Sequence, residues 1–196
     1  MIRPNHRARV AAIAIVLLSA AQLAAVVTLT GMLRGFTGES LGAAGANEAF
    51  ARAAPIVAVA EILKLLIACA QAMVVPPVAA AAPAPTARLA TLVAGIGGAL
   101  LFAASGILGL YAVAAQDPGF GPLVADLRYA GLGATGIFAL VLLSFEAPRL
   151  RRWHAFVTFF FGLACLVALF YAPAEWLAAP LGWAFWLGLA GRLRHR

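Results

Sequence analysis

The chain has 196 residues, of which 64% are apolar and 11% are charged, and its mean hydropathy is +0.99. A soluble domain carries roughly a quarter charged residues, because its surface faces water. The composition therefore excludes a soluble globular enzyme, a disordered segment, a disulfide scaffold and a coiled coil. The charges stand in short clusters between long uncharged runs. This pattern predicts an all-α integral membrane protein, with one transmembrane domain over residues 1–196.

Six runs that carry few or no charges are candidate transmembrane helices, since about 20 apolar residues cross the ~30 Å hydrocarbon core. The expected spans are residues 10–33, 53–75, 89–115, 129–145, 153–174 and 176–191. The second span is expected to end at Pro76-Pro77, and a turn-rich cap is expected over residues 116–128. The sixth span is the shortest, so its flanking arginines are expected to snorkel toward the interface.

The basic residues predict the orientation of these six spans. Both termini, the second loop and the fourth loop share one side, which holds ten arginines, whereas the other side holds three. The positive-inside rule then places both termini in the cytoplasm. The same asymmetry accounts for the net charge of +7, so no nucleic-acid partner is expected. Arg149, Arg151 and Arg152 are expected to contact anionic lipid head groups.

A cleaved signal peptide is the alternative for the first run. Arg3, Arg7 and Arg9 precede an apolar stretch that reaches Ser19-Ala20-Ala21, which resembles the layout of a secretory signal. The apolar run continues to Leu33, however, and signal peptides have shorter apolar regions than this. The length favours a retained first helix and six spans.

The residues that usually carry chemistry are sparse. His6, His154 and His195 lie at or outside the expected cytoplasmic boundary, so no span offers a histidine pair for haem or a metal. Cys69 and Cys165 lie within spans and form no CxxC motif. The sequence therefore predicts no cofactor, no metal site and no disulfide.

Two catalytic motifs occur by letter but lack their structural context. Residues 38–42 fit GxSxG, yet they fall in an expected outer loop with no preceding strand. Residues 131–136 fit GxGxxG, yet they fall inside an expected span with no βαβ unit around them. We therefore expect a protein that is not an enzyme, and an intramembrane enzyme acting on lipid is the least favoured alternative.

The second span is the one run with ionisable residues near its middle. At 100° per residue, one of its faces collects small and polar side chains, namely Ala54, Glu61, Lys64, Ala68, Gln71 and Ala72. The opposite face collects Ile56, Val59, Ile62, Leu63, Leu66, Met73 and Val74. The apolar face is expected to meet lipid, and the polar face is expected to point into the bundle.

Depth along the helices groups five residues into a candidate polar cluster. Lys64 is the midpoint of the second span and Gln22 lies in the middle of the first, so both are expected near the bilayer midplane. There the Gln22 carbonyl is placed to accept a hydrogen bond from the Lys64 ammonium. Glu61 lies about 4.5 Å closer to the outer face, at the expected height of Ser105, and Gln71 shares the polar face.

Two interpretations of this cluster stay open. In the first, Glu61 and Lys64 form an i,i+3 ion pair that is tolerated in the membrane because each charge neutralises the other. In the second, Glu61 changes protonation or binds a cation while Lys64 modulates it, since ionisable groups at the midplane are costly and mark functional sites.

The layout resembles an uncharacterised group of bacterial six-helix membrane proteins. The similar features are the arginine-rich start before Val10, the tripeptide Ala46-Asn47-Glu48 and the closing stretch at residues 180–188. The group is expected to carry an acidic residue near Gly182 or Trp183, which this chain lacks. The resemblance covers most of the chain, and it implies a topology rather than an activity.

Two functions follow as hypotheses. The first is a non-enzymatic accessory or scaffold subunit of a larger assembly in the bacterial inner membrane, with lipids and other integral-membrane subunits or a second copy as partners. The aromatic side chains of the fifth and sixth spans offer surfaces for such neighbours. The second is a small carrier of a solute, proton or cation that uses Glu61, Lys64 and Gln22. No glycine or proline interrupts the helix near Glu61, which gives the carrier less support.

Overall fold

The computed structural model describes residues 4–34, 43–146 and 150–193. Arg3, Arg149, His195 and the GxSxG stretch at residues 38–42 lie outside these ranges. All regular secondary structure in the described residues is helical, which confirms the predicted all-α class for this part of the chain.

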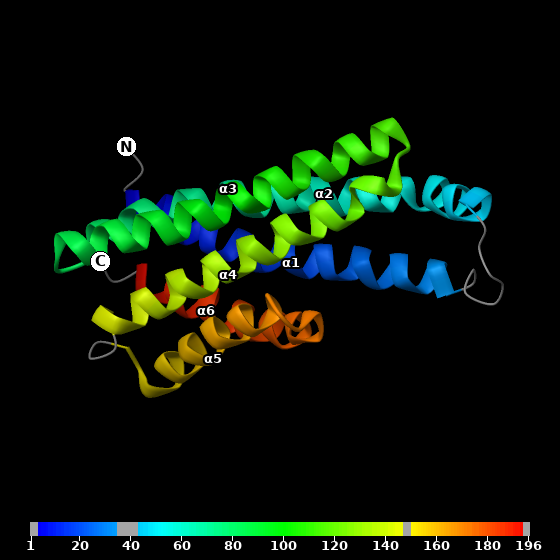
Figure 1. The fold of residues 1–196 in the computed structure, drawn as a ribbon. Helices are drawn as coiled ribbons and strands as arrows, with labels where there is room; N and C mark the ends of the chain where they lie inside the picture. Colours follow the sequence, from blue (N-terminus) through cyan, green and yellow to red (C-terminus); the bar gives the residue numbers. More distant parts are fainter. Residues whose placement is uncertain (1–3, 35–42, 147–149, 194–196) are drawn as a thin grey trace.

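The described residues form six α-helices (Figure 1). In chain order they are α1 (Pro4–Arg34), α2 (Ala43–Ala80), α3 (Pro85–Ala115), α4 (Gly121–Glu146), α5 (Arg152–Ala168) and α6 (Glu175–Leu193). Two short 3-10 turns, η1 (Pro118–Phe120) and η3 (Ala172–Ala174), precede α4 and α6.

Four of these helices are long and apolar enough to cross a membrane. They are α1, α2, α3 and α4, whose apolar stretches have mean hydropathies between 1.5 and 2.5. The fifth helix is apolar but has 17 residues. The chain is therefore a helical protein with at least four segments suited to the bilayer, and the fifth and sixth expected spans are formed by shorter helices.

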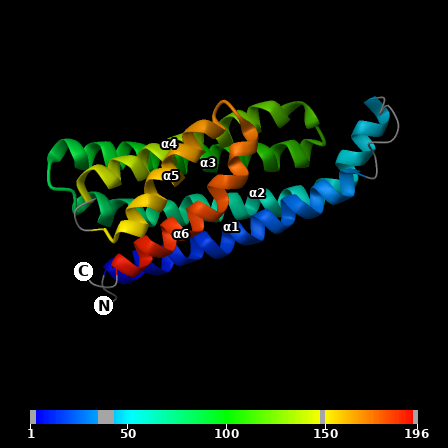
Figure 2. The same cartoon turned by 90° about the horizontal axis from the view of Figure 1, so that it is seen from below.

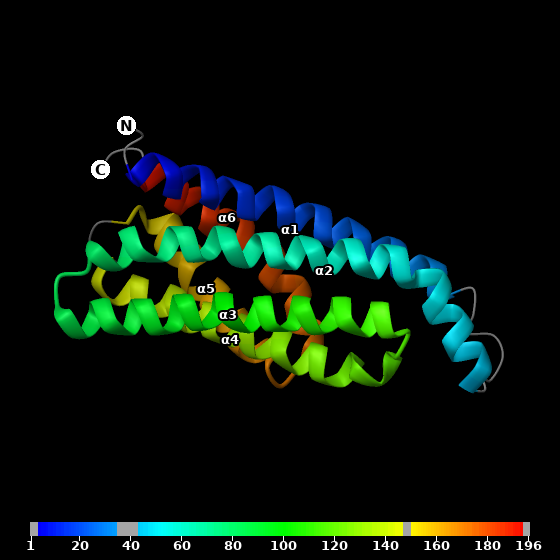
Figure 3. The same cartoon turned by 90° about the horizontal axis from the view of Figure 1, so that it is seen from above.

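The helices run up and down and close into a ring. Each helix packs against the next one along the chain, and α6 returns to pack against α1. Figures 1 and 3 show that α1 begins and α6 ends at the same end of the bundle. The α5–α6 hairpin reaches only part of the way along α1 and α2, as Figure 2 shows. The ring is thus complete at one end of the bundle and lacks two helices at the other.

The second helix continues through the proline pair that was expected to end it. Pro76 and Pro77 lie inside α2, which ends at Ala80, so the expected boundary was wrong. Each proline removes one backbone donor from the helix. Val74, Val75 and Val78 are buried beside the pair, and their packing against the other helices holds the segment helical despite the lost hydrogen bonds.

Two other boundaries differ from the expectation. The segment over residues 116–128 is not an irregular cap, because α4 begins at Gly121 and includes its second half. The fifth helix ends at Ala168, and the chain turns through η3 before α6. The expected fifth span over 153–174 therefore extends beyond the end of the helix. Hydropathy alone could not show this boundary, because the residues from Leu169 to Ala174 are apolar like those of the helix before them.

The GxGxxG stretch serves helix packing. A Cβ atom added to Gly131 would lie 3.3 Å from the carbonyl oxygen of Gly98 on α3. A Cβ on Gly136 would lie 2.8 Å from the carbonyl oxygen of Gly162 on α5. Both glycines therefore allow α4 to approach its two neighbours closely, as small residues do in membrane bundles.

Aromatic side chains fill the complete end of the ring. Phe138 and Phe185 are fully buried and pack edge to face, with ring centroids 6.3 Å apart. Phe161 stacks on Phe185 at 5.0 Å, and Trp186 stacks on Phe138 at 6.1 Å. This aromatic cluster, Phe138, Phe161, Phe185 and Trp186, closes the centre of the bundle at the level where all six helices are present.

Candidate functional site

A cavity of about 420 Å³ lies in the centre of the ring, next to the aromatic cluster. Its lining comes from α1, α2, α3, α4, α5, η3 and α6, so nearly every helix contributes to it. Pockets for small molecules usually have volumes of about 300–1,000 Å³ and mostly apolar walls with a few polar groups. The central cavity has both properties.

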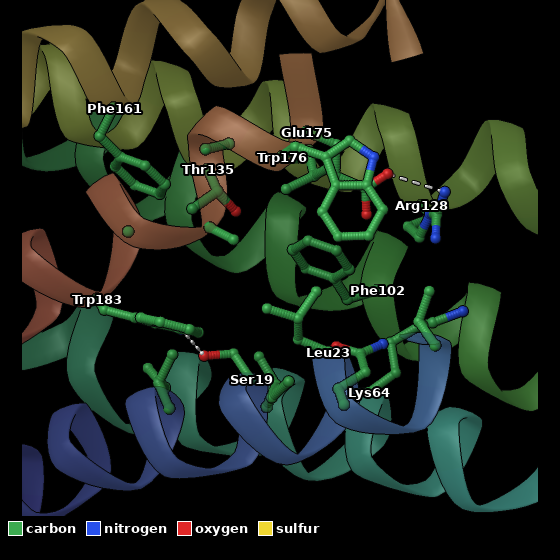
Figure 4. A pocket seen from close by; sticks show the side chains of 18 of the residues that line it. Ser19, Leu23, Lys64, Phe102, Arg128, Thr135, Phe161, Glu175, Trp176 and Trp183 are labelled. Atoms are coloured by element: carbon green, nitrogen blue, oxygen red, sulfur yellow. Dashed lines mark hydrogen bonds and ion pairs between the residues drawn. The ribbon is translucent and has the colours of Figure 1, made fainter. Parts of the chain in front are cut away.

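The lining is rich in aromatic side chains. They are Phe102, Tyr129, Phe161, Trp176, Trp183 and Trp186. Three of the four tryptophans of the chain therefore line the central cavity, and the fourth, Trp153, is absent from its lining. Trp183 is held in place by its indole N–H, which donates a 2.8 Å hydrogen bond to Ser19 Oγ on α1 (Figure 4). Phe161 and Trp186 belong to the aromatic cluster and form the apolar floor of the cavity.

Lys64 brings a buried positive charge to the cavity wall. Its Nζ donates to Glu61 Oε2 at 2.5 Å and to Ser105 Oγ at 3.0 Å. The side chains of Lys64 and Glu61 are only 4% and 10% exposed. Lys64 lines the cavity and Glu61 does not, so the cation faces the cavity and its carboxylate partner lies behind it. Glu61 fits there because a Cβ on Gly109 would lie 2.5 Å from its Cδ.

Gln71 lies two turns farther along α2 and connects this helix to α3 and α4 at the cavity wall. Its Nε2 donates to the carbonyl oxygen of Gly95 at 3.0 Å and to Thr135 Oγ1 at 3.1 Å. The side chain is almost fully buried, and both Gln71 and Thr135 line the cavity. No hydrogen bond within the described residues uses Gln71 Oε1. This oxygen is therefore an available acceptor at the cavity wall.

Gln22 does not take the place that the sequence suggested. The acceptors of Lys64 in the described chain are Glu61 and Ser105, and Gln22 lines the cavity wall from α1 without a hydrogen bond to the ammonium. The five predicted residues thus divide: Glu61, Lys64 and Ser105 form one hydrogen-bonded group, and Gln71 and Gln22 reach the same cavity separately.

The site has a second ion pair, between Arg128 and Glu175, that was not predicted from the sequence. Arg128 Nη2 on α4 lies 3.0 Å from Glu175 Oε2 at the start of α6, and their side chains are 27% and 35% exposed. Arg128 also donates to Tyr129 Oη at 3.1 Å, and both charged residues line the cavity. The sequence contained one signal for this pair. Arg128 precedes Tyr129 and Glu175 precedes Trp176, and both aromatic residues begin spans that were expected to start on the outer side.

Both ion pairs lie at the same end of the cavity. Ser105, which accepts from Lys64, donates at 2.8 Å to the carbonyl oxygen of Val124, one turn before Arg128 on α4. Figure 4 shows Arg128, Glu175 and Trp176 at one end of the cavity and Phe161 and Trp183 at the other. Lys64 therefore lies at the level of Arg128 and of the first turn of α6 along the bundle.

The apolar face of α2 lies on the outside of the bundle almost as expected. Val59, Ile62, Leu66 and Met73 are about half exposed on the outside of the bundle. Val74, which was assigned to the same face, is fully buried in the core. The helical wheel fails there because α2 is packed by α1 and α3 on two sides, and Val74 lies toward one of these contacts.

The opposite end of the bundle is closed by another ion pair. Glu146 at the end of α4 is buried and pairs with Arg192 of α6. Glu146 was expected just outside its span, as a loop charge. Because Arg128 and Glu146 are 18 residues apart on one helix, the two α4–α6 ion pairs are separated by about 27 Å along α4. The central cavity lies between them, next to the Arg128 pair.

The remaining predicted positions lie outside the cavity. Arg151 and Arg152 are exposed at the start of α5, and their contact with lipid head groups stays a prediction. His154 is buried near that end, and its Nε2 lies 3.3 Å from the carbonyl oxygen of Phe185. Within the described residues, no three His, Cys, Asp or Glu side chains gather as a metal site.

Comparison of the chain with protein-family models, with curated proteins and with solved structures gave no match.

Proposed function

We propose that the chain is a membrane-embedded binding protein that holds a small, mainly apolar molecule in the central cavity. The observation that carries this proposal is the cavity itself, which has the volume and aromatic lining of a small-molecule pocket.

The proposed topology has six spans with both termini in the cytoplasm of a bacterial cell. Helix α1 begins where α6 ends, as an even number of crossings requires. Arg152, Arg192 and Arg88 are close to the helix ends on that side of the bundle, which supports its cytoplasmic assignment. The layers of the Arg128 and Glu146 ion pairs are about 27 Å apart, close to the ~30 Å of a hydrocarbon core, and α6 reaches from one layer to the other. Helix α5 is about 26 Å long, so its crossing relies on tilt or local thinning of the bilayer.

In this topology the cavity lies toward the outer half of the membrane and is blocked on the cytoplasmic side by the aromatic cluster. A bound molecule exchanges from the outer side, where the α5–α6 hairpin ends early. Binding followed by release to the cytoplasm would require the aromatic cluster to separate. A carrier would be a binding protein of this kind that also releases its ligand to the cytoplasm. In either case the proposal assigns Lys64 and Gln22 to the cavity wall rather than to a proton path.

Quenching of tryptophan fluorescence tests the proposal. Trp153 is replaced by Phe, so that only Trp176, Trp183 and Trp186 emit, and the protein is reconstituted in nanodiscs. A bromine-tagged decanol is added as an apolar probe that quenches tryptophan on contact. We expect saturable quenching, and quenching that rises linearly, as simple partitioning into the lipid gives, would contradict the proposal.

Two matched alanine substitutions serve as the control. Ala179 on α6 lines the cavity, so Ala179→Leu adds side-chain volume inside it. Ala24 on α1 is exposed outside the lining, so Ala24→Leu adds the same volume toward lipid. The saturable component should disappear in Ala179→Leu and persist in Ala24→Leu. Equal quenching in both variants would show that the probe binds elsewhere.

A second candidate function is the accessory subunit, and the outer face of α5 favours it. Phe156, Phe159 and Phe160 are exposed there, and the rings of Phe156 and Phe160 are 4.4 Å apart. Native mass spectrometry after mild detergent extraction tests it. A complex that dissociates when Phe156 and Phe160 are replaced by Leu supports this function, and a monomer that is free of other chains contradicts it.

A further inference from the structure

We propose that the central cavity selects an amphiphile with one anionic head group, a carboxylate or a phosphate monoester, whose head replaces Glu175 as the partner of Arg128. This inference rests on the proposed function, because it names the chemical class of the molecule that the cavity holds. It follows from the way in which charge and apolar surface are distributed along the cavity.

The cavity has two chemically different ends. The floor is made of Phe161, Trp186 and the small residues Ala178 and Gly182, which offer a dry surface for a hydrocarbon chain. The other end has the cations Lys64 and Arg128, and Figure 4 shows Arg128 far from the Phe161 end. A molecule that satisfies both ends has an apolar tail and a polar head.

The polar end has more unused donors than acceptors. The Lys64 ammonium has three N–H donors, and Glu61 and Ser105 accept two of them. Arg128 Nη2 serves Glu175 and Tyr129, while Arg128 Nε is buried and has no acceptor among the residues that the structure describes. An unmade hydrogen bond on a buried cation is costly, so this end favours a ligand that brings acceptor atoms.

The two ion pairs differ in how easily they open. Glu61 is buried behind Lys64, in space that the absence of a side chain at Gly109 leaves open. Glu175 is 35% exposed and stands in the first turn of α6, so its carboxylate has solvent as an alternative partner. The Lys64 pair is therefore fixed, and Arg128 is the cation that can exchange one carboxylate for another. Exchange keeps the guanidinium paired throughout.

In the exchange, one negative charge leaves the polar end of the cavity as another enters it. With both ion pairs closed, the four charged side chains sum to zero. When an anionic head takes the place of Glu175, Glu175 turns toward solvent and carries its negative charge out of the cavity. The ligand head then faces Arg128 with Lys64 at the same end, and its tail extends to the aromatic floor.

Equilibrium binding of four ten-carbon amphiphiles to the nanodisc-reconstituted protein tests the inference, with decanoate, decyl phosphate, decanol and decyltrimethylammonium as probes. Charge-assisted hydrogen bonds contribute enough that we expect one of the two anions to bind at least about tenfold more tightly than decanol. The tighter of the two anions identifies the head group. Equal affinity for decanol and both anions, or tightest binding of the ammonium probe, would overturn the inference while leaving the proposed function intact. If none of the four probes binds saturably, the proposed function fails.

Two variants test the exchange at Arg128. Glu175→Gln removes the competing carboxylate and should tighten anion binding several-fold relative to decanol binding by the same variant. Arg128→Gln should reduce anion binding to the level of decanol. The double variant Glu61→Gln with Lys64→Met removes the other cation without stranding a charge, and should weaken anion binding as well. If Glu175→Gln leaves anion binding unchanged or weaker, the exchange is wrong.

Discussion

Removing the carboxylate of Glu61 should destabilise the protein much more than removing the whole Glu61–Lys64 ion pair. In Glu61→Gln the side chain keeps its shape, and the Gln carbonyl can still accept from Lys64 across 2.5 Å. The ammonium, however, is 4% exposed and loses its counter-charge. Breaking a buried pair in this way typically costs about 3–5 kcal/mol, unless the surviving group gives up its charge.

The double variant Glu61→Gln with Lys64→Met has no buried charge at this position. Its side-chain volumes are close to those of the native pair, so we expect its stability to lie within about 1 kcal/mol of the wild type. Lys64→Met should be destabilised as well, because it strands the buried Glu61 carboxylate, so the coupling from a double-mutant cycle should exceed about 3 kcal/mol. SDS titration of the folded fraction in mixed micelles measures all four proteins.

The chain provides a matched control for this cycle. Arg52 and Glu48 on the same helix form an i,i+4 ion pair at 2.6 Å, and both side chains are 62% exposed. Glu48→Gln should leave the unfolding midpoint unchanged, because exposed ion pairs contribute little. The reasoning would be refuted if Glu61→Gln were as stable as the wild type, since Lys64 would then have contact with water or another anion.

Three further substitutions test the packing around the site. Gly109→Ala should destabilise by about 1–3 kcal/mol, because its Cβ would lie 2.5 Å from Glu61 Cδ, and the loss should shrink when Glu61 is also replaced by Ala. Phe138→Ala should cost about 3 kcal/mol in the same SDS titration, since the ring is fully buried and stacks on Trp186, and a loss below 1 kcal/mol would contradict a packed aromatic cluster. Arg192→Met should destabilise more than the double variant that also carries Glu146→Gln, because Glu146 is buried; the reverse order would argue against this pair.

The sequence predicted the properties that belong to single helices. Uncharged runs located the long helices, and helical periodicity placed Lys64 and Gln71 inside the bundle and Met73 on its surface. Periodicity failed at Val74, because burial there depends on which two helices flank α2. The proline pair was also misleading, since propensity alone ends a helix where packing of Val75 and Val78 sustains it.

The parts of the site that could not be predicted are those between helices. The sequence gives neither the order of helices around the ring nor their relative heights, so Lys64 was paired with Gln22 rather than with Ser105. Arg128 and Glu175 are 47 residues apart, and their pairing depends on the early end of α5. The cavity has no signal in the sequence, because it is a space left by side chains from nearly every helix.

The most direct test of the central cavity is fluorine NMR of protein labelled with 5-fluorotryptophan. The four resonances are assigned by single Trp→Phe variants, and decanoate is then titrated into the nanodisc sample. We expect saturable shifts for Trp176, Trp183 and Trp186, which line the cavity, and no shift for Trp153, which lies outside it. Unchanged resonances for the three cavity tryptophans, or an equal shift of all four, would contradict this expectation.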